Sequence, residues 1–141
     1  MQRVRSAAVH VDGGLISEIG PGMLVLLGVT ATDTETDADR LARKVLALRI
    51  FADAEGRMNE PLGPRELLCV SQFTLYGDAS RGNRPSYVQA APGDLARPLY
   101  ERFCECAEAK RGAFGANMQV SIVGDGPVTL MLETGARRDR A

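Results

Sequence analysis

The sequence predicts an α+β fold of about six or seven strands and two helices, arranged in layers. Short apolar segments separated by glycine-containing turn signals fill the first thirty residues, which indicates strands. Two later stretches place apolar residues at helical spacing. The 141 residues suffice for one core, so we expect a single domain over residues 1–141.

The N-terminal strands are expected over residues 4–11, 15–19 and 23–27. Asp12-Gly13-Gly14 supplies the turn between the first two, and Gly20-Pro21-Gly22 precedes the third. The third segment is a continuous apolar run, which is typical of a strand buried on both faces.

Two helices are expected. The first follows an acidic stretch, residues 31–39, whose carboxylates favour the positive end of a helix dipole. Its apolar face would be made by Leu41, Val45 and Leu48. The second is expected to begin at Asp94, a good N-cap, with Pro98 tolerated near its first turn. Its apolar face would hold Leu95, Leu99, Phe103 and Cys106 or Ala107.

The remaining strands are expected over residues 49–52, 67–75, 118–123 and 128–132. Residues 124–127 would join the last two as the turn of a hairpin. The arginine-rich tail, residues 137–141, is expected to be loose.

Composition excludes several classes of function. The formal charge is −1, with 17 Lys and Arg against 18 Asp and Glu, which argues against a polybasic protein that wraps nucleic acid. The single histidine, His10, rules out a zinc site with two histidine ligands from one chain. A Ser–His–Asp or Cys–His site would have to use His10. No P-loop or G-x-G-x-x-G motif is present, and we expect neither a metal nor a cofactor.

The cysteines and the hydropathy pattern favour a cytoplasmic protein. Cys69, Cys104 and Cys106 are odd in number and include no C-x-x-C pair, which suits a reducing compartment. We expect them to be buried, inert thiols. No apolar run approaches the length of a signal peptide core or a membrane span, so we expect no membrane association.

Two segments carry candidate chemistry. In Ser71-Gln72-Phe73-Thr74-Leu75, alternation along a strand would place Ser71 and Phe73 on one face and Gln72 and Thr74 on the other. These polar groups indicate a polar pocket, or simply hydrogen bonding at a strand end.

In Gly124-Asp125-Gly126-Pro127-Val128-Thr129, two glycines allow close approach of the backbone to another group, although a plain hairpin turn has the same composition. The cis isomer of a Gly-Pro bond lies only ~0.5–1 kcal/mol above trans. Arg81 and Arg84, in the polar loop over residues 77–85, would meet phosphates or be simply solvated.

These two segments together resemble the D-aminoacyl-tRNA deacylase family, whose members carry an SQ-x-x-L strand and an N-x-GP-x-T turn. Further matches follow in the family's order over nearly the whole chain: Gln2-Arg3-Val4, Gly20-Pro21-Gly22, Met58-Asn59, Arg84-Pro85-Ser86 and Phe114-Gly115-Ala116-x-Met118-Gln119-Val120. Gly124 departs from the pattern, because the family has Asn there and glycine cannot supply the hydrogen bonds of the amide.

The resemblance implies a β-rich, barrel-like mixed sheet with two main helices, in a homodimer whose active sites lie at the subunit interface. It implies hydrolysis of the ester that links a D-amino acid, or glycine, to the 3′ adenosine of tRNA. Gly126-Pro127, in cis, would enter the partner's pocket and exclude an L side chain with backbone carbonyls.

The resemblance also implies roles for other residues. Ser71 and Gln72 would position the ester and stabilise the oxyanion through side chains or backbone N–H groups. The residues implied to bind substrate are Phe73, Phe114, Met118, Gly126 and Pro127. Thr74 is the one plausible nucleophile, but no base is evident to activate it, so we expect the terminal 2′-hydroxyl of the tRNA to assist a water.

Two other functions stay open. One is an achiral relative in the same fold that acts on other mischarged tRNAs. The other is a non-catalytic module that binds RNA 3′ ends, which the substitution at Gly124 keeps in consideration.

Overall fold

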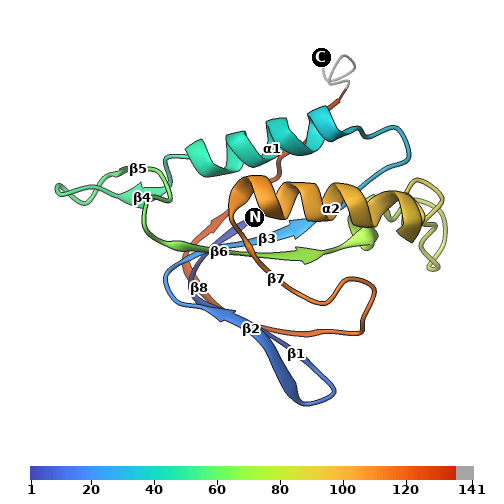
Figure 1. Ribbon diagram of the computed structural model, residues 1–141, viewed down its shortest axis with the longest axis horizontal. Coiled ribbons are helices and arrows are strands. Elements are labelled where there is room, and N and C mark those ends of the chain that lie inside the picture. The colour runs from blue at the N-terminus through green and yellow to red at the C-terminus, as the bar shows by residue number, and fades with distance from the viewer. Residues whose placement is uncertain (136–141) are drawn as a thin grey trace.

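The computed structural model describes residues 1–135, in which two helices lie on one face of a curved mixed sheet (Figure 1). The elements in chain order are β1 (Gln2–Val11), β2 (Gly14–Ile19), β3 (Gly22–Leu27), α1 (Glu35–Ala47), β4 (Phe51–Ala52), β5 (Met58–Glu60), β6 (Glu66–Ser71), the short 3₁₀-helix η1 (Phe73–Tyr76), α2 (Gly93–Ala107), β7 (Lys110–Arg111) and β8 (Gln119–Thr129). The predicted α+β class and both helices are confirmed. The tail over residues 137–141 lies outside the described residues.

The main sheet has the strand order β2-β1-β3-β6-β7, and β8 pairs with β1. The β3–β6 and β6–β7 pairs are parallel, whereas β1 runs antiparallel to β2, β3 and β8. Side-chain hydrogen bonds join the first and last strands of this order, β2 and β7. The Ser17 hydroxyl of β2 donates to the Arg111 carbonyl of β7 at 2.7 Å, and Lys110 Nζ donates to the Glu18 carbonyl at 3.0 Å. The sheet is therefore nearly closed into a barrel, as the resemblance implied.

The two central strands, β3 and β6, bury both faces because their apolar side chains alternate between two cores. The core beneath the helices includes Met23, Val25, Leu27, Leu67, Cys69, Ala42, Val45, Tyr100, Phe103 and Cys104. The core inside the curved sheet consists of Val4, Ala7, Val9, Ile19, Leu24, Leu68 and Val70. The predicted two-sided burial of residues 23–27 is confirmed.

Polar contacts fix the helix layer on the sheet. A capping box of Thr34 and Asp37 starts α1, which accounts for the acidic stretch seen in the sequence. Arg102 of α2 forms two hydrogen bonds to the Asp39 carboxylate of α1, at 2.8 and 2.9 Å, and this pair lowers the pKa of Asp39 to about 2. The buried Tyr100 hydroxyl donates to the Cys69 carbonyl at 2.8 Å and so connects α2 to β6.

The strand predicted over residues 67–75 is too long. Strand β6 ends at Ser71, and η1 follows at Phe73. The expected alternation of Ser71 and Phe73 against Gln72 and Thr74 is therefore wrong, because these residues do not share one extended strand. The apolar run continued into a turn that packs beside β3, so hydrophobicity alone did not mark the end of the strand.

The hairpin predicted between residues 118–123 and 128–132 is also wrong. Residues 119–129 form the single strand β8, which pairs with β1 along its length. Val4 of β1 pairs with Gly124 of β8, and Gln2 pairs with Thr129. An advance of two residues along β1 therefore corresponds to an advance of five residues along β8. The glycines and the proline therefore form a wide bulge inside one strand rather than a turn between two strands.

Helix α2 differs from the prediction in its start and in its buried face. Pro92 is the N-cap, and Asp94 lies in the first turn, where a carboxylate favours the helix dipole. Pro98 lies inside the helix rather than in its first turn. The buried residues are Tyr100, Phe103, Cys104 and Ala107, whereas Leu95 and Cys106 are exposed.

Two of the three cysteines are buried as expected, and the third is not. Cys69 and Cys104 lie in the core, and burial raises the pKa of Cys69. Cys106 is exposed, with its Sγ 3.2 Å from Asp39 Oδ1, and the bond to this carboxylate raises the pKa of the thiol. No helix within residues 1–135 is long and apolar enough to cross a membrane.

The β3–β6 pairing makes a prediction about glycine. A Cβ on Gly22 would overlap the carbonyl oxygen of its partner residue Glu66, whereas a Cβ on Gly20 would meet only the Glu66 side chain at 3.9 Å. Gly22→Ala should therefore lower the free energy of unfolding by about 1–3 kcal/mol, measured by urea denaturation. Gly20→Ala is the matched control and should change it by less than about 0.5 kcal/mol. Equal losses in both variants would contradict the close approach.

Candidate functional site

The carboxyl end of β6 positions the first candidate segment. Ser71, the last residue of the strand, lies opposite Leu27, and the Gln72 N–H donates to the Leu27 carbonyl at 2.8 Å. The chain then turns, with the Leu75 N–H bound to the Gln72 carbonyl at 3.2 Å and the Gly77 N–H to the Thr74 carbonyl at 2.9 Å. The Gln72 N–H is therefore used in the sheet and is not available to bind a ligand. A ligand at this end of the strand would have to be bound by other N–H groups of the segment.

Those groups are at the first turn of η1. Within residues 1–135, the backbone N–H groups of Phe73 and Thr74 donate to no other protein atom. The Gln72 side-chain amide donates to the Thr74 hydroxyl. The Phe73 ring is 58% exposed and meets Tyr87 edge-on, with the ring centroids 5.2 Å apart. The segment offers backbone donors beside an exposed aromatic wall, an arrangement suited to holding a developing negative oxygen.

Phe114 and Met118 lie at the same end of the molecule. The Gly112 N–H bonds to the Cys69 carbonyl at 3.1 Å, and a Cβ on Gly112 would touch both Met118 Sδ and Val70. The Phe114 ring lies 5.5 Å from the Tyr100 ring, between centroids, and packs against the core beneath the helices. The connection from β7 to β8 thus returns both residues to the region where β6 ends.

Gly126 and Pro127 lie elsewhere. Gly124 and Thr129, which flank them, are in register through β1 with Gly22 and Leu24 of β3. These positions are five and three residues from Leu27, which is opposite Ser71. At ~3.3 Å per residue, the bulge and the end of β6 are roughly 10–17 Å apart along the strand direction. The structure thus places Ser71, Gln72, Phe73 and Thr74 together at the end of β6. The segment that carries Phe114 and Met118 runs beside β6, where these two side chains pack against different cores, and Gly126 and Pro127 lie apart.

The bulge is held by a residue to which sequence reasoning assigned no role. Arg3, whose side chain is 14% exposed, lies on β1 opposite the bulge. Its Nε donates to the Asp125 carbonyl at 3.2 Å, and its Nη1 donates to the Ile50 carbonyl at 2.6 Å. Arg3 also pairs with the Asp125 carboxylate at 3.3 Å. The sequence feature that could have indicated this role is the position of Arg3 directly before a predicted β segment, in the motif Gln2-Arg3-Val4.

The glycines of the bulge have different environments. Gly126 has a φ of 130°, and a Cβ there would lie 2.8 Å from the Val128 nitrogen. The Gly126–Pro127 peptide bond is cis. Gly124 has open space around it and does not adopt a positive φ, so no positive φ is needed where the family has Asn.

The described residues provide no conventional catalytic base at Thr74. Its hydroxyl accepts the Gln72 amide, and no His, Asp or Glu side chain of residues 1–135 hydrogen-bonds to it. No group of three or more His, Cys, Asp or Glu side chains in that part of the chain is placed to hold a metal ion. His10 lies on β1, opposite Leu15 and Gln119.

A sequence profile of the family described as D-Tyr-tRNA(Tyr) deacylase matches residues 1–133. The chain belongs to this family. It is 51% identical to a D-aminoacyl-tRNA deacylase of Chlorobaculum parvum over 142 residues, which cover 95% of each chain. It is 50% identical to the protein of the same name from Thermosipho africanus, again with 95% of each chain covered. The resemblance inferred from the motifs is confirmed.

Two solved structures share the fold of this chain. The fold matches a structure described as a c-Myc DNA unwinding element binding protein, with a TM-score of 0.90, 42% identity and coverage of 96% of this chain and 97% of that one. It also matches a probable eukaryotic D-amino acid tRNA deacylase, with a TM-score of 0.76, 18% identity and coverage of 89% and 92%. The second match supports the fold alone.

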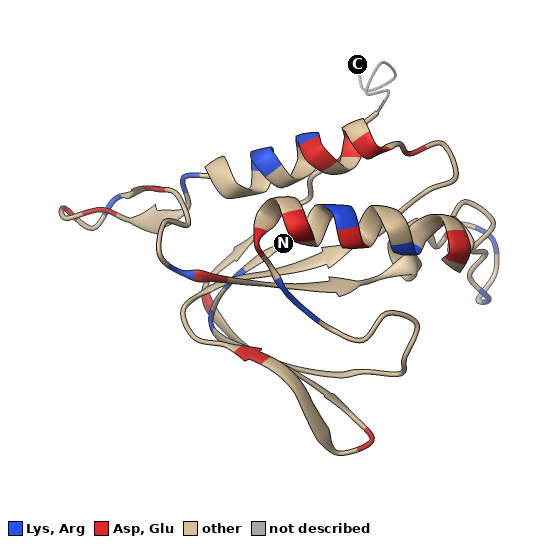
Figure 2. Cartoon of the chain, viewed as in Figure 1, with Lys and Arg blue, Asp and Glu red and all other residues tan. Residues whose placement is uncertain are grey.

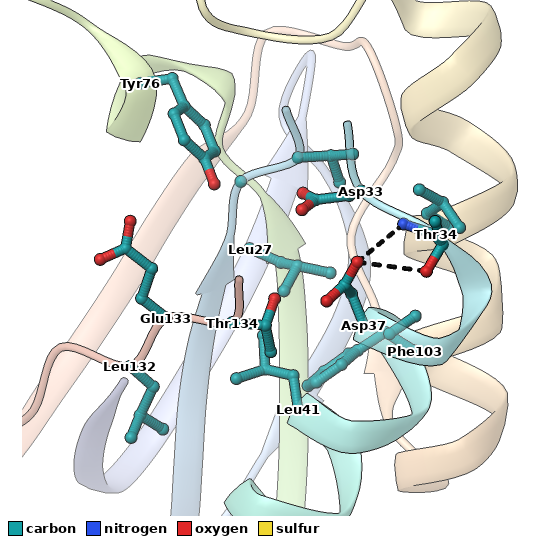
Figure 3. A pocket seen from close by; sticks show the side chains of 14 residues that line it. Leu27, Asp33, Thr34, Asp37, Leu41, Tyr76, Phe103, Leu132, Glu133 and Thr134 are labelled. Carbon is teal, nitrogen blue, oxygen red and sulfur yellow. Dashed lines mark hydrogen bonds between the residues drawn. The ribbon is translucent and has the colours of Figure 1, made fainter. Parts of the chain in front are cut away.

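Two cavities of this deacylase-family chain lie beside η1, and none of the eight predicted site residues lines either. The larger, about 580 Å³, lies between η1, β3 and the segment after β8. The smaller, about 60 Å³, lies at the start of α1, where Asp33, Asp37 and Glu133 gather near Tyr76 (Figure 3). The groups predicted to bind substrate therefore lie outside both of these cavities.

The pKa values of two carboxyl groups in the smaller cavity, Asp33 and Asp37, are shifted in opposite directions. Burial, followed by the charges of Asp37 and Glu133, raises the pKa of Asp33, although the Thr30 N–H bond opposes the rise. Hydrogen bonds from the Thr34 backbone and side chain lower the pKa of Asp37. Asp33 therefore costs stability in its charged form, whereas Asp37 contributes stability in its charged form.

These shifts predict opposite effects of neutralisation. Asp33→Asn should raise the free energy of unfolding at about pH 7, and the gain should shrink as the pH falls through the carboxyl pKa toward about pH 3. Asp37→Asn should lower it at about pH 7, and the loss should shrink over the same range. Urea unfolding at both pH values measures this. Shifts of the same sign in the two variants would contradict the electrostatic account of this cavity.

Proposed function

We propose that the protein hydrolyses the ester bond of D-aminoacyl-tRNA and releases free tRNA and the D-amino acid. The observation that carries the proposal is the cluster at the end of β6, where unoccupied N–H groups of Phe73 and Thr74 lie beside an exposed ring. Membership in the deacylase family gives the substrate class. An aminoacyl ester is already activated, so positioned donors suffice without a strong base.

In the proposed reaction, Ser71 and Gln72 help to position the ester, and the N–H groups of Phe73 and Thr74 hold its carbonyl oxygen. A water attacks the carbonyl carbon, with the terminal 2′-hydroxyl of the tRNA assisting. The new C–O bond forms to the water oxygen, and the bond to the ribose 3′-oxygen breaks. The water proton passes to the 3′-oxygen, so tRNA and a free carboxylic acid result. The donors are most useful when the oxygen carries charge, which lowers the barrier to attack.

The proposed chiral filter is the Gly126–Pro127 backbone of a second subunit. Both residues are exposed, and they lie apart from the end of β6 in their own chain. In a homodimer, the bulge of each chain would enter the site of the other and close it with backbone carbonyls. Phe114 and Met118 would line the remaining wall. An L side chain would clash with these carbonyls, whereas a D side chain or glycine would not.

The substrate also suggests where the protein acts. Charged tRNA is used in translation, so we propose that the protein works in the cytoplasm. A module that only binds RNA 3′ ends would need the same surface, and it is distinguished below by the absence of turnover.

The activity is tested by following ester loss from D-tyrosyl-, L-tyrosyl- and glycyl-tRNA. We expect rapid loss from the D and glycyl forms and at least about 100-fold slower loss from the L form, because a backbone clash excludes the L side chain. Equal turnover of the D and L forms would instead indicate the achiral relative. Binding without turnover of any form would indicate the non-catalytic module.

The role of Thr74 is tested by Thr74→Val, which keeps the shape of the side chain and removes its hydroxyl. Turnover of D-tyrosyl-tRNA should stay within about 5-fold of wild type, because the proposed route uses the backbone N–H rather than the hydroxyl. Thr36→Val, at an exposed position on α1, is the matched control. A loss of about 1000-fold or more confined to Thr74→Val would make Thr74 the nucleophile and overturn this route.

A further inference from the structure

A loop beside the site carries two arginines to which the proposed chemistry gives no role. This arginine loop, residues 78–86, leaves η1 through Gly77 and returns at Tyr87. Its ends are joined by two backbone hydrogen bonds between Asp78 and Ser86, each 2.8 Å long. Tyr87, directly after the loop, contacts the exposed Phe73 ring. The base of the loop is thus attached to the segment proposed to hold the ester.

Arg81 and Arg84 have no protein partner for their charges. Both are exposed, and neither forms an ion pair or a hydrogen bond with any residue that the structure describes. Other cations are committed to carboxylates, as Arg102 is to Asp39 and Lys110 is to Glu66. The two free guanidinium groups therefore keep their full hydrogen-bonding capacity for a ligand.

The acidic residues near the loop do not neutralise it. Asp78 is the one acidic residue within residues 78–86, and it sits at the base of the loop, where it accepts the Ser80 N–H at 2.9 Å. Arg97 of α2 adds a further cation on the same side, with its guanidinium 5.0 Å from the centre of the Phe114 ring. Phe114 thus has an arginine over its ring, and Phe73 contacts Tyr87, which directly follows the arginine loop.

The arginine loop is a basic segment at one end of the molecule. Acidic residues gather at the start of α1 and basic residues mark the loop after η1, whereas α2 carries charges of both signs (Figure 2). The loop lies at the opposite end of the molecule from the β4–β5 hairpin (Figure 1). A polyanion that reached the end of β6 past the loop would meet Arg81 and Arg84.

We propose that the arginine loop holds one or two backbone phosphates of the tRNA strand that ends at the esterified adenosine. This inference rests on the proposed function and adds the part of the protein that recognises RNA beyond the reacting ester. Guanidinium groups bind phosphate through paired hydrogen bonds and match this ligand better than a neutral loop would. Contact with only one or two phosphates agrees with a protein whose formal charge is −1.

The test is the double variant Arg81→Gln/Arg84→Gln. With D-tyrosyl-tRNA, KM should rise about 5- to 20-fold while kcat stays within about 2-fold, because the phosphates are held equally before and during reaction. The dependence of log(kcat/KM) on log salt should become less steep by about 0.7 for each lost phosphate contact. With 3′-D-tyrosyl adenosine, which has no backbone phosphate, the double variant should equal wild type.

The matched control is Arg40→Gln/Arg57→Gln, which makes the same charge change at two exposed arginines on α1 and near the β4–β5 turn. The proposal is overturned if the loop variant and the control behave alike on D-tyrosyl-tRNA. It is also overturned if the loop variant loses as much on the adenosine ester, because the loop would then shape the site rather than bind phosphate.

Binding of uncharged tRNA, followed by fluorescence anisotropy, separates this proposal from the hydrolysis itself. Failure of wild type to cleave D-tyrosyl-tRNA counts against the proposed function alone. A weaker, less salt-dependent affinity of the loop variant relative to the control still supports phosphate contact in that case. Equal affinities of the two variants refute it.

Discussion

The parallel pairing of β3 with β6 is the constraint on which the rest of the structure depends. It requires the backbones to meet so closely at Gly22 and Glu66 that no Cβ fits there. The pairing lets each strand bury one face under the helices and the other inside the curved sheet. It also fixes where Ser71 ends its strand, since Leu27 is its partner, and so determines where η1 begins. The location of the proposed oxyanion donors thus follows from the pairing of two apolar strands.

A second consequence is that the two parts of the proposed site lie apart within one chain. The donors and aromatic residues gather at the carboxyl end of β6, whereas the Gly126–Pro127 bulge lies beside the N-terminal part of β1. Arg3 holds the bulge by bonds to the Asp125 and Ile50 carbonyls, so its shape does not depend on a side-chain amide at position 124. Glycine at that position is therefore compatible with a well-positioned bulge. The separation of the halves favours a site completed by a second chain.

Much of the fold and part of the site were predictable from residue patterns. The apolar run before Gly28 and the acidic start of α1 report local burial and capping, and these predictions held. Helical spacing located both helices, although the start and the buried face of α2 differ from the prediction. The end of β6 and the continuity of β8 depend on which strand lies alongside, which local patterns do not contain. Arg3 was missed as a positioning residue for the same reason, because Asp125 is 122 positions away in the chain.

The central claim is that the working site combines the β6 end of one subunit with the Gly126–Pro127 bulge of the other. The most direct test mixes two defective chains, Gln72→Ala/Phe73→Ala and Gly126→Ala, into isolated mixed dimers and measures ester loss from D- and L-tyrosyl-tRNA. The account predicts that the mixed dimer regains both rate and D selectivity at one of its two sites, since that site receives an intact β6 end and an intact bulge. A mixed dimer that behaves as the average of the two parent homodimers would contradict it.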